Sequence, residues 1–322
     1  MAVVAGIDEA GLGPVLGPLV VSAVAFRAAD RAAGESMWDL LRGTVTRRPP
    51  RKRFAIAIDD SKKLYSSRTA GGLERLERGV LAMLAARSGA PPTVKKMLAI
   101  LCPQSADALS QYPWYADADL PLPRTFASTD LDLAANALRV AFRKAGIRLE
   151  TMRAETVFTG EFNRLISATR NKATAALGVT GRLLMHLWES YPDDPLRILI
   201  DRQGGRTRYL PALQRMFAGC RFKVIDEGEA LSAYHISDGP RRAELHFLVR
   251  GEQQHLPVAL ASMMSKYLRE LFMEMFNGFW ARHVTDLKPT AGYYTDGNRF
   301  YRDIVPAARR LGVDEQMLYR CR

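Results

Sequence analysis

The chain begins with a short apolar segment that ends in two adjacent carboxylates, and this arrangement constrains the fold more than any other feature. Val3 to Ile7 have the composition of a buried β-strand, and Asp8 and Glu9 follow directly. Carboxylates at the end of a buried strand are costly unless a positive charge meets them, and a metal ion is the obvious candidate. Because neighbouring strand residues point to opposite faces, we expect the strand to end here so that both acids can reach one site.

A glycine-rich loop follows the two acids. We expect Gly11, Leu12 and Gly13 to end the strand and to let another backbone, such as a nucleic-acid strand, approach closely. Two other interpretations stay open: a strand-to-turn junction with solvated acids, and a nucleotide-binding loop with the spacing G-x-G-x-x-x-G that ends at Gly17. The second is disfavoured because the acids would repel a pyrophosphate and residues 19–26 continue as a strand, not a helix.

The composition is that of an ordinary globular chain with a basic balance. The 322 residues, 48% of them hydrophobic and 25% charged, suffice for one good core and one appended subdomain. The net charge of +12 favours a polyanionic partner. Three distant cysteines without a C-x-x-C motif exclude an obvious zinc site or disulfide framework and predict a cytoplasmic protein. We see no secretory signal and no apolar stretch long enough to span a bilayer, and expect no membrane partner.

Hydrophobic periodicity predicts alternating strands and helices. We expect strands at residues 3–8, 18–26, 147–157, 196–200, 221–235 and 243–250, and helices at 69–87, 131–145 and 162–188. The helix at 131–145 should be amphipathic through Leu133, Ala137, Val140 and Phe142. Residues 88–128 are interpreted as an irregular insertion whose aromatic residues Trp114 and Tyr115 pack in the protein. The strands expected between Asp201 and Glu252 would form a hairpin that widens the sheet or shields a groove.

Charged side chains accompany two further apolar segments. A polar segment, Asp60 to Lys63, follows a short apolar run. One interpretation is purely structural: a helix cap with a lysine pair behind it. Asp201 ends an apolar run typical of a central strand, where a charge is expensive unless it is paired or bound to a metal. An ion pair with a nearby arginine remains the alternative, from Arg202, Arg206 or Arg208. The basic run at 47–53 either contacts phosphates or is a solvated loop.

Five blocks of sequence share an order and a pattern. They are the opening stretch of residues 6–18, Asp60 to Leu64, Ile198 to Asp201, Gly251-Glu252 with the small-residue segment 257–266, and Gly292 to Thr295. In this order they resemble the signature of the type 2 ribonucleases H, the ribonuclease HII and HIII family. The set is far more specific than any one block.

The resemblance implies an α/β ribonuclease H-like fold, in which helices flank a mixed central sheet and a helical part forms the C-terminus. We expect a catalytic domain at residues 1–266, with insertions near 88–128 and 205–250, and a substrate-binding helical part at 267–322. A monomer is expected.

The resemblance also implies metal-dependent endonucleolytic cleavage of the RNA strand in RNA–DNA hybrids, with ribonucleotides embedded in DNA as a further candidate substrate. The products would carry 5′-phosphate and 3′-hydroxyl ends. Two Mg²⁺ or Mn²⁺ ions would be held by Asp8, Glu9, Asp201 and Glu252. The expected substrate contacts are Gly11, Leu12, Gly13, Ser61, Lys62, Lys63, Ser262, Lys266 and Tyr293. The adjacent Tyr294 is expected to pack on the protein, and His255 to be an ordinary histidine without a catalytic role.

Three features depart from the family pattern. Leu12 occupies the position where the family has a basic residue between two glycines, and a leucine side chain cannot bind a phosphate. Glu252 stands where ribonuclease HII has Asp, which is closer to HIII, yet the separate N-terminal domain of HIII is not expected because Asp8 lies so early. Two alternatives therefore stay open: an RNA–DNA hybrid-binding protein that has lost turnover, and a metal-dependent DNA nuclease or resolvase of related fold.

Overall fold

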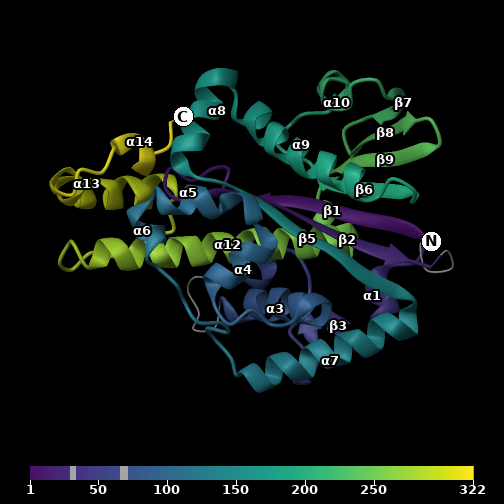
Figure 1. Ribbon diagram of the computed structural model, residues 1–322, viewed down its shortest axis with the longest axis horizontal. Helices are drawn as coiled ribbons and strands as arrows, with labels where there is room; N and C mark the ends of the chain where they lie inside the picture. Colours follow the sequence, from purple (N-terminus) through teal and green to yellow (C-terminus); the bar gives the residue numbers. More distant parts are fainter. Residues whose placement is uncertain (30–33, 66–71, 322) are drawn as a thin grey trace.

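The computed structural model describes residues 1–29, 34–65 and 72–321, and its centre is a seven-stranded mixed sheet (Figure 1). The strand order is β5-β2-β1-β6-β9-β8-β7. β1 pairs in parallel with β6, and β6 with β9, whereas the other neighbours are antiparallel. The bounds are β1 Ala2–Ala10, β2 Leu19–Ala28, β5 Ile147–Val157, β6 Leu196–Asp201, β7 Arg221–Glu227, β8 Leu231–Asp238 and β9 Arg241–Leu248. A small separate pair joins β3 (Val45–Thr46) and β4 (Ile56–Ala57).

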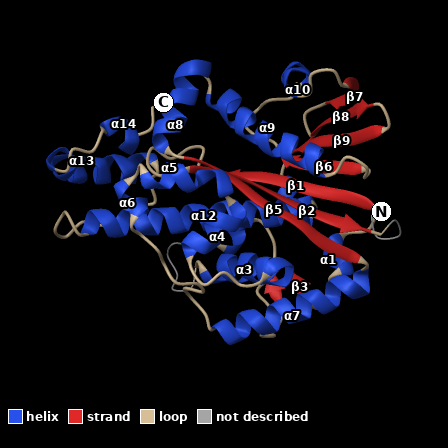
Figure 2. Cartoon of the chain, viewed as in Figure 1, coloured by secondary structure: helices blue, strands red, loops and turns tan. Residues whose placement is uncertain are grey.

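Helices cover both faces of the sheet (Figure 2). One face carries α8 (Thr159–Thr169), α9 (Lys172–Ser190) and α10 (Leu210–Met216), and the other carries α3 (Glu74–Ser88), α4 (Val94–Leu101), α7 (Ser128–Ala145) and α12 (Leu256–Ala281). At the far end of α12 lie α13 (Tyr294–Arg310) and α14 (Glu315–Leu318). The short helices are α1 (Met37–Leu40), α2 (Ser61–Leu64), α5 (Ala106–Ser110), α6 (Pro113–Ala116) and α11 (Gly251–Gln254). This arrangement confirms the predicted fold class.

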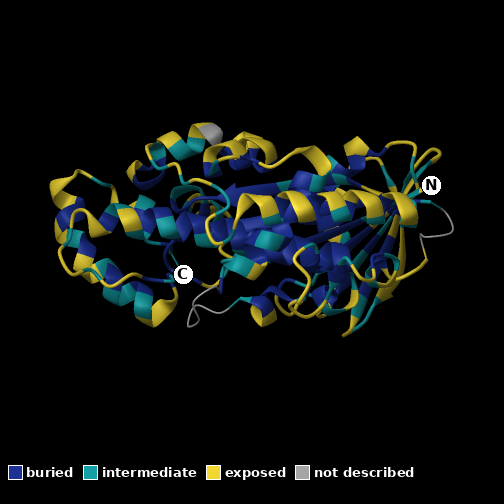
Figure 3. Cartoon of the chain, turned by 90° about the horizontal axis from the view of Figure 1, so that it is seen from below, coloured by how far each residue is buried: buried dark blue, intermediate teal, exposed yellow. Residues whose placement is uncertain are grey.

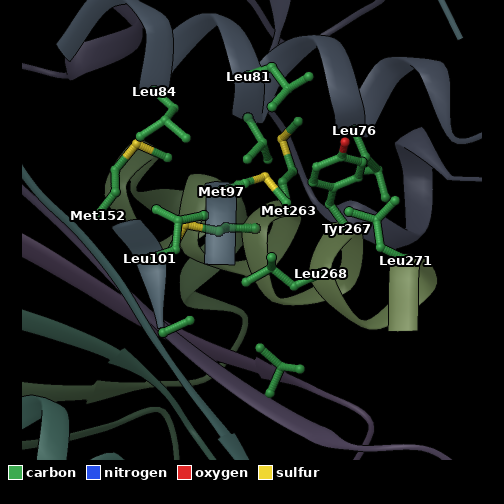
Figure 4. Close-up of a cluster of buried hydrophobic side chains, with 14 of the residues drawn as sticks. Leu76, Leu81, Leu84, Met97, Leu101, Met152, Met263, Tyr267, Leu268 and Leu271 are labelled. Carbon is green, nitrogen blue, oxygen red and sulfur yellow. The ribbon is translucent and has the colours of Figure 1, made fainter. Parts of the chain in front are cut away.

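The long helix α12 lies directly against β1 at a glycine. A Cβ added to Gly6 would lie 2.2 Å from the backbone of Pro257 and Val258, so any larger residue would push the helix off the strand. On its other side α12 packs against α3, where Leu81 and Met263 are fully buried (Figure 4). Figure 3 shows the buried residues in the sheet and on the inner sides of the helices. The helix α12 therefore packs between α3 and the central strand β1.

The predicted helix at 162–188 is wrong as a single element. It is broken between α8 and α9 by Arg170, whose φ of 51° lies in the left-handed region. Asn171 then begins α9 by accepting a hydrogen bond from the backbone N–H of Thr174, at 3.0 Å. The hydrophobic period continues across the break, so the pattern alone did not show it, but an Asn at an N-cap is a recognisable signal.

About half of the predicted irregular insertion at 88–128 is in fact helical. It contains α4, α5, α6 and a 3₁₀ turn at Pro103–Ser105. Trp114 and Tyr115 are buried, as expected, and their rings contact Phe276 and Phe272 of α12. These helices are short and end at proline or polar residues, which is why no long period marked them.

The core-facing stripe of α7 differs from the predicted one. Leu133 and Val140 are 44% and 42% exposed, whereas Leu131 and Leu138 are buried together with Phe142. Both sets have helical spacing, and only the packing against α3 selects between them.

Three other predicted boundaries can be compared with the structure. The helix expected at 69–87 is α3, from Glu74, and residues 69–71 lie outside the described residues. The strands expected at 221–235 and 243–250 are β7, β8 and β9, of which β7 and β8 widen the sheet while β9 is a parallel neighbour of β6. The boundary expected between residues 266 and 267 falls inside α12. Within the described residues, no helix is both long enough and apolar enough to cross a lipid bilayer.

Candidate functional site

The carboxyl ends of β1, β6 and β9 lie at one edge of the sheet, because these three strands are parallel. Asp8 and Glu9 are in β1, Asp201 is the last residue of β6, and Glu252 lies in α11 shortly after β9. The sheet topology therefore gathers at one edge four carboxylates from three separate parts of the chain.

β1 does not end at Asp8 as expected. Its antiparallel pairing with β2 continues to Ala10, whereas its parallel pairing with β6 stops at Ile7 and Ile200. The sheet opens on one side only, so Asp8 and Glu9 keep the alternation of a strand and emerge on opposite faces.

Asp8 is buried on the α12 face. Its carboxylate accepts the backbone N–H of Glu9 at 2.7 Å and hydrogen-bonds to Ser262. Burial, followed by the charges of Glu9 and Glu252, raises the pKa of Asp8 well above its usual value. The Ser262 hydroxyl also lies 3.0 Å from that of Ser61, which brings α2 to the site.

Glu9 faces the α9 side of the sheet. Gln203 Nε2 donates to Glu9 Oε2 at 3.0 Å and to the hydroxyl of Thr180 at 2.9 Å. Burial raises the pKa of Glu9 to about 7, and the charge of Asp201 adds to this while the Gln203 bond and the nearby Lys62 oppose it.

Asp201 completes the cluster together with Glu252. The backbone N–H of Gly251 donates to Asp201 Oδ1 at 2.8 Å. Burial, then Asp8, then Glu252, raises the pKa of Asp201 to about 8. Glu252 is 7% exposed, and its Oε2 has no hydrogen-bond partner among the described residues.

The arginines considered as ion-pair partners of Asp201 are occupied elsewhere. Arg202 donates to Gly228 O and the Ser232 hydroxyl, Arg206 to the Thr174 hydroxyl, and Arg208 lies 3.9 Å from Glu227. No ion pair between Asp201 and a cation exists within the described part of the chain.

The chemistry of these acids suits a hard divalent cation. They offer only oxygen donors, one of which is buried and unpaired, and burial, followed by the neighbouring acids, raises the pKa values of Asp8 and Asp201. In the described residues, however, no three His, Cys, Asp or Glu side chains are already arranged to hold a metal ion. Binding would therefore require the carboxylates to rotate toward a common centre.

The residues expected to contact substrate differ in exposure and in their contacts. Gly13 is exposed, whereas Leu12 is half-buried and packs against the core on the α9 side. Lys62 and Lys63 are exposed on α2. Lys266 is engaged within the protein, because its Nζ lies 2.6 Å from Glu270.

The two adjacent tyrosines do not differ as expected. Tyr293 and Tyr294 are each 52% exposed, and the guanidinium of Arg269 lies 5.7 Å from the Tyr293 ring centre. His255 caps the short helix before α12. In the basic run, Arg47 pairs with Asp59 at 2.9 Å.

Sequence analysis did not identify several residues that position the acids. Gln203 and Thr180 orient Glu9. Ser265 donates to Asp8 O at 3.0 Å, and its hydroxyl lies 2.7 Å from that of Ser22. Gln203 could have been suspected because it follows Asp201 closely. Thr180 lies within a helix whose period carries no functional signal.

No protein-family model matches the chain, and neither does any curated protein sequence. Solved structures are similar at low identity. The ribonuclease HII in a PCNA complex from Archaeoglobus fulgidus has a TM-score of 0.44 and 16% identity, covering 99% of this chain and 94% of that one. Ribonuclease H2 from Pyrococcus horikoshii OT3 has a TM-score of 0.43 and 14% identity, covering 98% and 92%.

Bst-RNase HIII in complex with Mn²⁺ has a TM-score of 0.42 and 14% identity, and covers 99% of this chain and 66% of that one. All three similarities have TM-scores below 0.5 and identities of 16% or less.

Proposed function

We propose that this protein is a divalent-metal-dependent endoribonuclease that cleaves the RNA strand of RNA–DNA hybrids. The observation that carries the proposal is the group of carboxylates at one sheet edge, held together although burial and mutual repulsion raise the pKa values of Asp8, Glu9 and Asp201. Such a group destabilises the fold, and a bound cation would compensate for it. The five-block resemblance and the net charge of +12 support an RNA–DNA substrate.

Each acid has its own support for this role. Asp8 and Asp201 are held by backbone N–H groups, Glu9 by Gln203, and Glu252 keeps Oε2 for another ligand. When bound, Mg²⁺ or Mn²⁺ ions supply an activated water and neutralise the charge that develops on the phosphate. Ser262 lies beside Asp8 and bonds to Ser61, and Lys62 lies near Glu9; these three side chains would contact the substrate backbone. The proposed products carry 5′-phosphate and 3′-hydroxyl ends.

A second candidate is an RNA–DNA hybrid-binding protein without turnover. Two observations favour it: Leu12 packs on the core at the position where a basic residue is expected, and no ready metal cage exists among the described side chains. The same experiment separates the two candidates.

Purified protein should be assayed with Mg²⁺ and with Mn²⁺ on matched RNA–DNA, single-ribonucleotide and all-DNA duplexes. We expect cleavage of the hybrid, and Asp8→Asn should lower the rate by at least about 100-fold while hybrid binding and thermal melting stay close to the wild type. Hybrid binding without cleavage would establish the second candidate. Cleavage of the all-DNA duplex at an equal rate would point to a DNA nuclease or resolvase, and full activity in Asp8→Asn would overturn the site.

A further inference from the structure

Two arginines lie buried behind the glycine loop of residues 11–17. Arg269 projects from α12 and Arg320 from the segment after α14, and each is 1% exposed. Within the described part of the chain, Nε and Nη1 of Arg269 and Nε and Nη2 of Arg320 have no hydrogen-bond partner. Burying guanidinium N–H groups without hydrogen-bond partners destabilises the folded state, so these two arginines lower the stability of the fold unless another interaction compensates.

Neither arginine has a carboxylate to itself. Glu270 lies 3.7 Å from Arg269 Nη1, but it already binds Lys266 at 2.6 Å. Arg320 has no carboxylate within ion-pair distance among the described residues, and its guanidinium lies 4.4 Å from the ring centre of Phe162. Burial, followed by the charge of Arg269, lowers the pKa of Arg320 to about 9, which leaves it a cation at neutral pH.

The two guanidinium groups instead bind carbonyl oxygens of the glycine loop. Arg320 Nη1 donates to Gly11 O at 2.5 Å and more weakly to Pro14 O at 3.5 Å. Arg269 Nη2 donates to Ala291 O, outside the loop, at 2.9 Å and more weakly to Leu16 O at 3.3 Å. Gly11 has a φ of 90°, and a Cβ added there would lie 2.6 Å from Arg269 Nε. Three carbonyls of the loop thus turn inward, toward two buried positive charges.

We propose that Arg269 and Arg320 are positioning residues for an anion subsite on the outer side of this loop, where they supply to a phosphodiester strand the positive charge that Leu12 lacks. This inference rests on the proposed function. A charge in the low-dielectric interior acts through the intervening backbone without touching the phosphate, because solvent screens it little.

A rescue experiment separates this electrostatic role from a purely structural one. Hybrid binding, its salt dependence, and KM and kcat are measured for Arg320→Gln, Leu12→Arg and the double variant, with thermal melting as the folding control. Arg320→Gln should weaken binding and raise KM by about 10-fold, with a smaller change in kcat, and should reduce the salt slope by about 1. Leu12→Arg should restore most of the lost affinity in the Arg320→Gln background and gain less in the wild type.

Unchanged binding in Arg320→Gln would overturn the inference, as would an equal gain from Leu12→Arg in both backgrounds. If the wild type binds no hybrid at all, the proposed function fails, which is a distinct result.

A second measurement uses the wild-type protein and does not depend on a buried substitution. Hybrids that each carry one neutral methylphosphonate are compared in turn with the unmodified hybrid. One position should lose about 10-fold in affinity, and Leu12→Arg should increase the loss at that same position. If Leu12→Arg leaves the position profile unchanged, or if no position matters in the wild type, the loop is not an anion subsite.

Discussion

Asp8 and Glu9 are neighbours in sequence, yet different layers of the molecule hold them. Asp8 is tied to Ser262 of α12, and Glu9 to Gln203 and through it to Thr180 of α9. Each acid is therefore sensitive to the helix on its own face of the sheet. A mutation in either layer can disturb the site without touching a carboxylate.

Tyr293 allows a prediction at the scale of one residue. Its half-exposed ring can stack on a sugar or base, a contact worth about 1 to 3 kcal/mol. Tyr293→Ala should lower kcat/KM at a single ribonucleotide in DNA by about 10-fold, and less on a long hybrid, where many registers are available. Tyr293→Phe should keep most of the activity.

Tyr294→Ala is the matched control, because Tyr294 is equally exposed and adjacent. Equal losses on the two substrates in Tyr293→Ala would mean that the ring is structural. A larger loss in Tyr294→Ala than in Tyr293→Ala would show that Tyr294, not Tyr293, stacks on the substrate.

Single residues also show what could be predicted from the sequence. Asp8, Glu9 and Asp201 stand out because a charge at the end of an apolar run is unusual, and the structure places them at one sheet edge. Arg269 and Arg320 gave no such signal. Arginine is normally a surface residue, and only tertiary packing shows that these two are buried.

At the scale of elements, strands were predicted more reliably than helices. β5 has the expected bounds, because an apolar run between turn residues is a local pattern. The face of α7 and the break after α8 depend on packing and on a single left-handed residue, and neither appears in a hydrophobic period. Parallel pairing of β9 with β6 is non-local and could not be derived from either segment alone.

The contact between β1 and α12 gives a prediction at this scale. Gly6→Ala would place a methyl group 2.2 Å from the backbone at Pro257, so α12 must move and carry Ser262 away from Asp8. We expect a loss of about 1 to 3 kcal/mol of stability and reduced cleavage. Chemical denaturation and kcat measure the two effects.

Gly178→Ala in α9 is the control, since a Cβ there meets no atom within 4 Å. It should be neutral or stabilise the protein by up to about 1 kcal/mol, because alanine favours the helix. If both variants behave alike, the close approach of α12 to β1 has no energetic role.

At the scale of the whole molecule, the acid cluster links stability to pH. The pKa of Asp201 in the folded protein is about 8, against a usual value of 3.8, so the folded state binds a proton that the unfolded state releases. Its contribution to stability is complete below about pH 4 and is lost as the pH rises through about 8. Asp8 and Glu9 act in the same direction.

The midpoint of thermal unfolding in EDTA should therefore fall as the pH rises across this window, more in the wild type than in Asp201→Asn. Added Mn²⁺ should reverse the difference by stabilising the wild type only. Parallel curves of melting temperature against pH for the two proteins would show that ionisation of Asp201 does not destabilise the folded protein.

The paired strands β1 and β6 are far apart in the sequence, so they are synthesised at different times. β1 is made before β6, its parallel partner, and the two are separated by most of the catalytic-domain sequence, while Glu252 follows β6. Pairing between such distant segments forms late in folding. A growing chain that carries only Asp8 and Glu9 has two of the four acids and no edge on which to gather them. The proposed capacity to bind metal and cleave RNA would therefore arise only after the segment that carries Glu252 has been made.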